Sequence, residues 1–542
     1  MNSVSLSDAH RGAAALRAFV TPWRMAWLLA ALAGALVSFW PLGMAGDYMN
    51  HLARNHIEAR LWFDPILHEN YTVSFEIIPD LAMDMIVPWL SYATGIYAAG
   101  AFMIWAAFVL PPIAGLLIAR TLHGRVSWVA LLGFLAMFNQ NMQWGFVNFA
   151  VSTGLALIGF ALWIRSGPSW RRTFAFAPFG VLLALGHALG FLLLGYLVLL
   201  WEIASYAAGQ RGSPADFLRQ LATKDAAAMV PGLLVVLIAT GGAEQLPQAG
   251  VINFALGQKI DSLWSGAAFF SPSLAKLVTI VLVCVFWLGL RRGVLAMEPR
   301  MVWVCGGLLA LIVALPTTVL GIWGLQFRYQ AVLIILAAAS VRVAPGHDRL
   351  ARQVAVAATL LLAAVYANGA FQMARIDGFA RANRDLLAGV SEGARVLSAG
   401  HEEADPLLAF HAAAIAVIER SAYVPNLFTN TSPVGVRPEM RAFHMPQAWP
   451  LLEAQLAASA SLEPPGSANG YWSPEYYYGW PRHWDYVVYF RSTPEQSLSH
   501  PFLCRQAEVP GAVLYRISRD GCAPDAAQVS RRGTPSDPAR HS

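Results

Sequence analysis

The sequence predicts an all-α polytopic membrane bundle of about eleven transmembrane helices, followed by a small C-terminal extracytoplasmic α/β domain. Hydrophobic residues make up 57% of the 542 residues, and charged residues only 13%. The charged share is about half of the roughly 25% that is usual in soluble domains. A soluble protein of this composition would have too little polar surface to cover its core. The apolar residues also gather in separate runs, which end near residue 375.

The apolar runs have the lengths expected of membrane-spanning helices. A bilayer core of about 30 Å needs roughly 20 apolar residues per helix. On that scale the predicted spans are residues 25–45, 97–119, 126–139, 146–164, 173–186, 188–206, 226–241, 274–290, 301–320, 329–344 and 353–373. The first run is interpreted as a retained helix. The alternative is a cleaved signal peptide, whose apolar region is usually 7–15 residues long.

Two apolar stretches are too long for a single crossing. Residues 126–164 are interrupted by "NQNMQW", and residues 173–206 are interrupted only by "GHALG". Each stretch has basic residues at both of its ends. Because Lys and Arg favour the cytoplasmic side of a membrane, each stretch is predicted to form a hairpin.

The basic residues also predict sidedness. With residues 1–24 as a cytoplasmic N-terminal segment, the inner segments hold 17 Lys and Arg and the outer loops hold 5. This bias satisfies the positive-inside rule, and it explains the net charge of +5 without a nucleic-acid partner. The remaining 15 of 37 lie in the C-terminal part, which carries no weight because long domains translocate largely regardless of charge.

The composition changes after about residue 375, where Pro and charged residues rise. Residues 385–520 are predicted to form the α/β domain, because "WDYVVYF" and "AVLYRIS" have the β-branched and aromatic character of strands. Residues 521–542 are predicted to be a disordered tail. Cys504 and Cys522 either form a disulfide in an oxidising compartment or stay free, and their spacing leaves both alternatives open.

The first outer loop, residues 46–95, is rich in titratable groups. Asp47, His51, Arg54 and Glu58 recur at intervals of three or four, which places them on one face of a helix. The face is either part of an active site or the polar side of a helix lying on the membrane surface.

A second acidic cluster lies later in the same loop. Glu76, Asp80 and Asp84 stand among apolar residues just before the second span. Acidic groups at the edge of hydrocarbon are costly, so they indicate a functional site. The alternative is a helix N-terminus stabilised by acids, and for Asp80, which follows Pro79, a capping role is at least as well supported.

Several segments together resemble a known family. They are "GDYMNHLAR" after the first span, "FNQNMQWGFVNFAVSTGLALIGFALW", "LGHALGFLLLGYL" and "GLQFRYQAVLIILAAA". With its long first outer loop, its many spans and its C-terminal extracytoplasmic domain, the chain resembles the GT-C superfamily of integral-membrane glycosyltransferases over residues 25–375. The resemblance implies an enzyme of a bacterial inner membrane, with a cytoplasmic N-terminus and a periplasmic C-terminal domain. Such an enzyme moves a sugar from a polyprenyl-phosphate donor to a glycan or lipid acceptor at the outer face, among membrane lipids.

The resemblance also assigns roles to individual residues. An acid in the first outer loop acts as the general base or helps to hold a divalent metal, and Asp47 occupies that place. Arg328 would hold the lipid phosphate. His51, Arg54 and His187 are further candidates for substrate binding.

The chain departs from the family at one point. Many members carry a pair of acids in the first loop, whereas here Asp47 is followed by Tyr48. Glu76, Asp80 or Asp84 would then supply the second catalytic carboxylate. The identity of a cofactor, including a divalent metal, stays open. Two other functions also stay open: a lipid or glycan transporter or flippase, and a non-catalytic envelope-assembly protein. The absence of an inverted repeat and the few charges in mid-span speak against transport.

Overall fold

The computed structural model describes residues 21–74, 76–241, 252–268, 270–319, 322–429, 432–446, 448–463, 473 and 475–522. The chain divides into two compact units. The first consists of Met1–Leu61, Val73–Ala380 and Phe428–Gly435, and the second of Trp62–Thr72, Arg381–Leu427 and Val436–Ser542. The predicted disordered tail lies outside the described residues from residue 523 onward.

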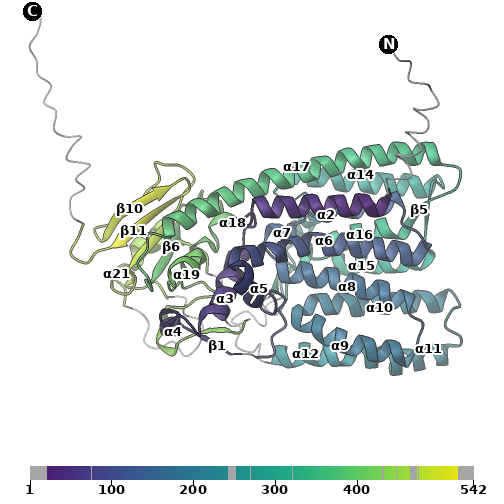
Figure 1. The fold of residues 1–542 in the computed structure, drawn as a ribbon, viewed down its shortest axis with the longest axis horizontal. Helices are drawn as coiled ribbons and strands as arrows, with labels where there is room; N and C mark the ends of the chain where they lie inside the picture. The colour runs from purple at the N-terminus through teal and green to yellow at the C-terminus, as the bar shows by residue number, and fades with distance from the viewer. Residues whose placement is uncertain are drawn as a thin grey trace, which may run out of the picture. The chain divides into compact units, whose positions relative to one another are not determined.

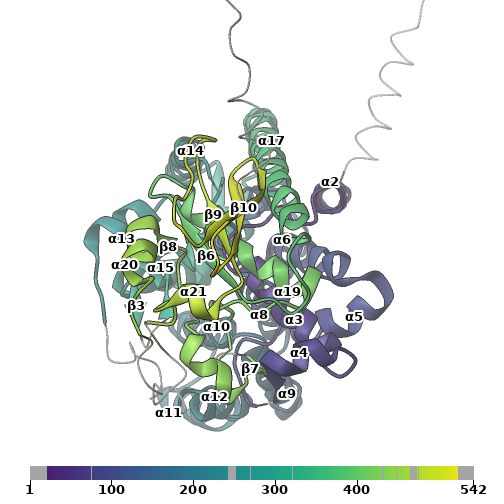
Figure 2. The same cartoon turned by 90° about the vertical axis from the view of Figure 1, so that its left-hand side faces the viewer.

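The first unit is a helical bundle whose long helices run side by side (Figure 1) and are seen end-on in Figure 2. Its α-helices are α2 (Pro22–Phe39), α3 (Tyr48–Arg60), α5 (Val87–Thr94), α6 (Ile96–His123), α7 (Gln140–Gln143), α8 (Val147–Arg165), α9 (Trp170–Gly186), α10 (Ala188–Ala207), α11 (Pro214–Gln220), α12 (Ala226–Gly241), α13 (Leu256–Ser262), α14 (Pro272–Arg291), α15 (Pro299–Ala314) and α16 (Gln330–Ser340). Helix α17 (Asp348–Leu387) carries the chain from the first unit into the second. Two short antiparallel pairs join β2 (Leu295–Met297) to β5 (Val341–Val343) and β3 (Thr318–Val319) to β4 (Ile322–Trp323).

Seven helices in the described part of the chain are long and apolar enough to cross a membrane, which makes this a multi-pass membrane protein. They are Pro22–Phe39, Ile96–His123, Val147–Arg165, Ala188–Ala207, Pro214–Ala239, Pro272–Arg291 and Ala355–Leu387. Two shorter apolar helices, Pro299–Ala314 and Leu325–Ser340, accompany them. The structure does not establish the predicted number of eleven spans.

One predicted span differs clearly from the structure. Residues 126–139 form a 3-10 helix, Trp128–Ala136, of nine residues. At about 2.0 Å per residue this element is about 18 Å long, which is too short for a bilayer core of about 30 Å. All of its residues except Trp128 are buried. The run is therefore apolar because it packs inside the bundle.

The second predicted break is present. Helices α9 and α10 are separated by His187 alone, whose backbone is extended (φ −171°, ψ 124°). The side chain of His187 caps the start of α10 by accepting a hydrogen bond from the Leu189 amide. The Trp170 end of α9 and the Ala207 end of α10 therefore each lie a full helix length away from His187. The Arg165 end of α8 lies at the same end of the bundle as these two.

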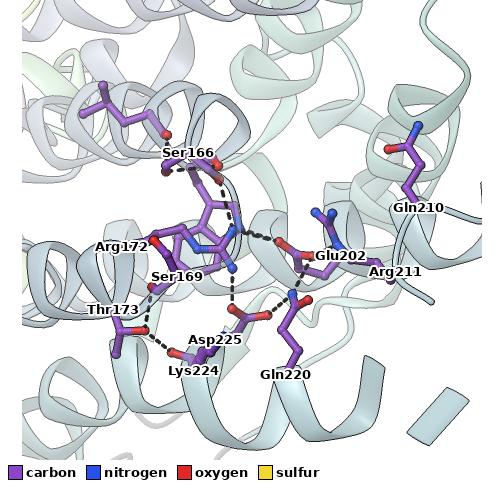
Figure 3. A network of polar contacts seen from close by, with 12 residues as sticks. Ser166, Ser169, Arg172, Thr173, Glu202, Gln210, Arg211, Gln220, Lys224 and Asp225 are labelled. Atoms are coloured by element: carbon purple, nitrogen blue, oxygen red, sulfur yellow. Dashed lines mark hydrogen bonds and ion pairs between the residues drawn. The ribbon is translucent and has the colours of Figure 1, made fainter. Parts of the chain in front are cut away.

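Those far ends meet in a buried polar network (Figure 3). Glu202 of α10, which is fully buried, accepts hydrogen bonds on both of its carboxylate oxygens. Trp163 (2.8 Å) and Arg172 (3.2 Å) donate to one oxygen, and Arg211 (2.6 Å) and Gln220 (3.1 Å) donate to the other. The carboxylate is thus satisfied by donors from α8, α9, α11 and the turn after α10.

Arg172 extends the network to a second acid. Its guanidinium pairs with Asp225 at 2.5 Å and lies 3.7 Å from the ring centroid of Trp163. Asp225 ends a π-helical turn, Leu221–Asp225, that leads into α12. The network therefore sets the lengthwise positions of α8, α9, α10 and α12 relative to one another.

The second unit contains a five-stranded mixed sheet in the order β10-β11-β9-β6-β8. β6 (Val396–Gly400) runs parallel to β9 (Tyr486–Phe490) and β8 (Leu451–Leu452), whereas β11 (Ala512–Ile517) is antiparallel to β9 and to β10 (Leu503–Val509). The strands predicted from "WDYVVYF" and "AVLYRIS" are β9 and β11. Short helices accompany the sheet: α4 (Pro65–Asn70), α18 (Pro406–Ala409), α19 (Ile415–Arg420), α20 (Glu453–Ser459) and α21 (Trp480–His483). The chain also contains the short strands β1 (Tyr71–Val73) and β7 (Val434–Val436).

Of the two alternatives left open for Cys504 and Cys522, the structure contains the disulfide. It joins the first half of β10 to the residues that follow β11, and so ties together the two strands at one edge of the sheet.

Replacement of Arg172 by Ala is predicted to destabilise the bundle strongly, because Asp225 then stays buried without its cation and Glu202 keeps only Arg211. Breaking a buried ion pair from one side costs about 3–5 kcal/mol. The measurement is the thermal midpoint of the purified protein in detergent. The neighbouring Arg171 is exposed, so Arg171→Ala is the matched control and should leave the midpoint unchanged. Equal midpoints for the two variants would contradict the assignment.

Candidate functional site

The start of α3 is fixed by two close backbone approaches. Gly46 has a φ of +60°, and a Cβ on it would lie 2.4 Å from the Trp144 carbonyl oxygen. Gly145 has a φ of +73°, and a Cβ there would lie 2.5 Å from the Ala45 carbonyl oxygen. The Asp47 amide donates a hydrogen bond to the Trp144 carbonyl at 2.9 Å. Only glycine fits at both positions, so Asp47 is held against the junction of α7 and α8.

The predicted polar face of α3 exists, but most of it does not face water. His51, Arg54 and Glu58 are 4%, 0% and 9% exposed, while Asp47 is half-buried. The His51 ring contacts the edge of the Phe428 ring, with 5.8 Å between centroids. The alternative of a helix that turns this face to the water at the membrane surface is therefore wrong. Burial of so many polar groups within one unit instead indicates a built site.

Arg54 pairs with Asp84 at 2.5 Å, and both side chains are almost fully buried. Arg54 also donates to the Asp80 carbonyl oxygen at 3.4 Å. Burial raises the pKa of Glu58 above its ordinary range, and the negative charge of the adjacent Asp84 raises it further. Glu58 is therefore neutral at pH 7, and the three side chains form a cluster without net charge. Arg54 and Asp84 are thus engaged with each other, so they hold the loop in place.

The segment around Asp80 is held by backbone pairing to the break between α9 and α10. The Leu81 amide donates to the Leu185 carbonyl at 2.9 Å, and the Ala188 amide donates to the Pro79 carbonyl at 3.1 Å. These bonds place the Asp80 side chain beside His187, whose Nε2 lies 3.9 Å from the Asp80 carboxylate.

Asn148 of α8 fixes the same segment from the other side. Its amide nitrogen donates to the Asp80 carbonyl at 2.9 Å, and its amide oxygen accepts from the Met83 amide at 2.7 Å. The sequence reasoning missed this residue. The signal was a lone Asn within the apolar stretch that follows Gly145, where a polar side chain needs a partner.

Asp80 is suited to exchange a proton near neutral pH. Its side chain is 28% exposed and that of His187 is 15% exposed, so both are within reach of solvent. Burial nevertheless raises the pKa of Asp80 to about 7, against the opposing effect of Arg54. Because Nδ1 of His187 accepts a hydrogen bond, the proton of the neutral ring is assigned to Nε2, which faces Asp80.

Arg328 connects the two accessible acids. Its guanidinium lies 3.7 Å from the ring centroid of Phe146 and 5.0 Å from that of Phe149, and donates to the Trp323 carbonyl at 3.4 Å. It is close enough to Asp47 and Asp80 to interact electrostatically with both. A buried cation is therefore placed in one environment with two carboxylates.

The predicted site residues thus separate into groups. Asp47, Asp80, His187 and Arg328 come together, as do Arg54, Asp84 and Glu58. Glu76 is exposed. His51 packs on Phe428.

A metal is not supported by the donor set. Among the residues that the structure describes, no three His, Cys, Asp or Glu side chains lie close enough together to hold an ion. Asp47, the residue that the resemblance offers for a divalent metal, belongs to no such group in the described part of the chain. The chemistry below is therefore derived from the side chains alone.

The fold of the chain is similar to that of a solved membrane protein, ArnT, and this similarity agrees with the predicted resemblance at the level of the fold. The chain aligns with the crystal structure of ArnT from Cupriavidus metallidurans bound to undecaprenyl phosphate. The TM-score is 0.51 and the identity 12%, over 92% of this chain and 99% of that chain. The apo structure of the same protein aligns with a TM-score of 0.49 and 12% identity, over 93% and 100% of the two chains. No protein-family model matches the sequence, and neither does any curated protein.

The raised pKa of Asp80 predicts a dependence of stability on pH. The folded protein keeps the Asp80 proton up to about pH 7, while the unfolded chain loses it near pH 3.8. The folded state is therefore favoured at low pH, and this contribution is lost as the pH rises from about 4 to about 7. At 1.36 kcal/mol per pKa unit, it amounts to at most about 4 kcal/mol.

The test compares thermal midpoints at pH 5 and pH 8. We expect the midpoint of the unmodified protein to fall, and the fall to shrink in Asp80→Asn. Glu76→Gln, at an exposed acid of the same loop, should keep the full fall. An unchanged pH dependence in Asp80→Asn would contradict the raised pKa.

Proposed function

We propose that this protein is a membrane glycosyltransferase that moves a sugar from a polyprenyl-phosphate donor to an envelope acceptor. The reaction takes place at the side of the membrane that holds loop 46–95, which the predicted topology assigns to the outer face of the inner membrane. The observation that carries the proposal is the placement of Arg328 in one environment with Asp47 and Asp80. The fold supports it, because the solved ArnT structure of the same fold binds undecaprenyl phosphate.

Asp47 acts as the general base. It takes the proton of an acceptor hydroxyl while the hydroxyl oxygen attacks the anomeric carbon of the sugar. The bond between that carbon and the phosphate oxygen breaks, and the electron pair leaves with the lipid phosphate. General-base catalysis of this kind contributes about 10²–10⁴ in rate. Asp47 suits the role because it is half-buried at the start of α3, within reach of a substrate.

Arg328 stabilises the phosphate that leaves. A guanidinium carries five N–H donors in a fixed fork, which matches phosphate oxygens. The Arg328 side chain donates a hydrogen bond to the Trp323 carbonyl at 3.4 Å. The ring of Phe146 holds the guanidinium by its face, which leaves the edge and its donors available. Because the cation is 6% exposed, its attraction for the phosphate is weakly screened by water.

Asp47 is followed by Tyr48, where many GT-C enzymes carry a second acid. Asp80 supplies the second carboxylate in its place. With a pKa of about 7, it exchanges protons with solvent at neutral pH. Its neighbours His187 and Arg328 belong to the same environment as Asp47. Asp80 therefore receives the proton that Asp47 takes from the acceptor, directly or through water.

Asp47→Asn is predicted to lower the rate of sugar transfer by about 10²–10⁴, because the amide cannot accept the acceptor proton. The measurement is transfer of radiolabelled sugar from a polyprenyl-phosphate donor into envelope material by the reconstituted protein. Glu76→Gln should keep full activity, and equal thermal midpoints would exclude unfolding. Undiminished transfer by Asp47→Asn would remove the general base from the proposal. Lipid movement without transfer would favour a flippase instead.

Arg328→Gln is predicted to weaken binding of undecaprenyl phosphate by about ten- to a hundredfold. Hydrogen bonds to charged groups contribute about 1.5–3 kcal/mol, and 1.4 kcal/mol corresponds to a factor of ten. Native mass spectrometry measures the bound fraction directly. Binding by Arg328→Lys should fall between that of the unmodified protein and that of Arg328→Gln, because lysine keeps the positive charge but lacks the forked donors of the guanidinium. Equal binding by all three proteins would exclude Arg328 as the phosphate ligand.

A further inference from the structure

A crevice of about 680 Å³ lies between α2 and α6, which run side by side (Figures 1 and 2). One wall comes from residues between Gly34 and Pro41, and the other from residues between Thr94 and Trp105. These two helices precede and follow the loop that holds Asp47 and Asp80. None of the residues that contact the Arg328 guanidinium lines the crevice.

Small residues contribute part of the crevice lining, among them Gly34, Gly95 and Ala98. Trp105 closes one end by donating its indole N–H to the Ala30 carbonyl at 3.1 Å. Gly34 makes room for this indole, since a Cβ on it would lie 3.3 Å from the ring nitrogen. Towards the other end, α6 presents Ala98 and is preceded by Gly95, where a Cβ would have no atom within 4 Å.

The walls are mostly apolar, and their hydroxyl groups belong to Ser38, Thr94 and Tyr97. The Ser38 hydroxyl donates to the Gly34 carbonyl at 2.8 Å, and the Thr94 hydroxyl donates to the Leu90 carbonyl at 3.0 Å. Both hydroxyls are thus engaged within their own helices. The rest of the lining is largely hydrocarbon and aromatic, including Val37 and Phe102. Such a surface favours an apolar chain over water.

The depth of the crevice matches one leaflet. From Ile96 to Trp105 helix α6 rises about 14 Å at 1.5 Å per residue, which is close to half of a bilayer core of about 30 Å. Both α2 and α6 are long and apolar enough to cross the membrane. Just before the crevice, α5 exposes Trp89 (73%) and Tyr92 (51%), aromatic residues typical of the headgroup region. The open end therefore lies near the headgroups, and the closed end lies near the middle of the bilayer.

The open end adjoins the first turn of α3. The Tyr48 hydroxyl donates to the carbonyl of Pro41, a lining residue, at 3.2 Å. The Tyr48 ring occupies the space that Gly100 of α6 leaves, since a Cβ on that glycine would lie 2.6 Å from the hydroxyl oxygen. Tyr48 directly follows Asp47, so a lipid in the crevice would bring its headgroup to the side of the site where Asp47 lies.

We propose that the crevice between α2 and α6 holds one acyl chain of a lipid acceptor, whose headgroup hydroxyl is thereby presented to Asp47. The acceptor and the polyprenyl carrier then approach the site from different sides, the acceptor at Asp47 and the carrier at Arg328. This inference rests on the proposed function and narrows its acceptor from a glycan or a lipid to a lipid.

Photolabelling tests the crevice itself. The full chain is reconstituted in vesicles of phosphatidylethanolamine and phosphatidylglycerol that contain phosphatidylethanolamine with a diazirine in one acyl chain. After irradiation, mass spectrometry maps the labelled residues. We expect at least fivefold more label on crevice residues than on exposed α2 residues at the same depth. Uniform labelling around α2 and α6 would overturn the proposal.

Two variants fill the crevice from opposite walls. Ala98→Trp and Ser38→Phe should each reduce the crevice label at least fivefold, and either one suffices if the other fails to fold. Ala35 is exposed on α2 outside the crevice lining, so Ala35→Trp is the matched control and should label normally. Undiminished label in both crevice variants would overturn the proposal.

Two further measurements identify the occupant as the acceptor. Added undecaprenyl phosphate should leave the label in place, whereas displacement would assign the crevice to the carrier and overturn the proposal. Ala98→Trp should lower sugar transfer into the lipid fraction more than tenfold while binding of undecaprenyl phosphate is unchanged. Normal transfer would show that the crevice holds only bulk lipid. Photolabelling of the Asp47→Asn variant does not depend on catalysis. It therefore separates a failure of the crevice to bind lipid from a failure of the protein to transfer sugar.

Discussion

The buried ion pair between Arg54 and Asp84 is the interaction on which the candidate site depends. It joins α3 to the segment before α5, and so fastens the two ends of the first loop together inside one unit. A neutral Glu58 beside the pair keeps the cluster free of net charge. Removal of one partner from such a pair is strongly destabilising, because the other charge stays buried. The pair thereby supports the backbone bonds of Leu81 and Ala188 and the Asn148 amide, which hold Asp80 beside His187.

The helices that carry the site are ordered from both ends. Helices α8, α9 and α10 deliver Asn148 and His187 at one end, while their other ends meet around Glu202. Every carboxylate oxygen in the network around Glu202 accepts a hydrogen bond, which is typical of a structural role. The groups around Arg328 differ, since Asp47, Asp80 and His187 remain partly accessible. Chemistry is therefore expected at the accessible end.

Sequence patterns predicted the multi-pass bundle, the strands β9 and β11, the break at His187 and the shared face of α3. They did not predict that this face is buried, because helical spacing is the same on a wet and a covered face. The cover includes Phe428, which lies 377 residues after His51 in the sequence. Residues 126–139 were assigned a span because apolar composition marks burial in protein as well as in lipid. Asn148 was missed because its partners are backbone groups that only the folded loop brings near.

The central claim is that Asp47 and Arg328 face one enclosed space that receives a lipid phosphate. An experimental structure of the full chain with bound undecaprenyl phosphate tests it most directly. We expect phosphate oxygens within hydrogen-bonding distance of the Arg328 guanidinium, with the Asp47 carboxylate opening into the same space. A phosphate bound away from Arg328, or an Asp47 side chain turned to bulk solvent on another face, would contradict the account.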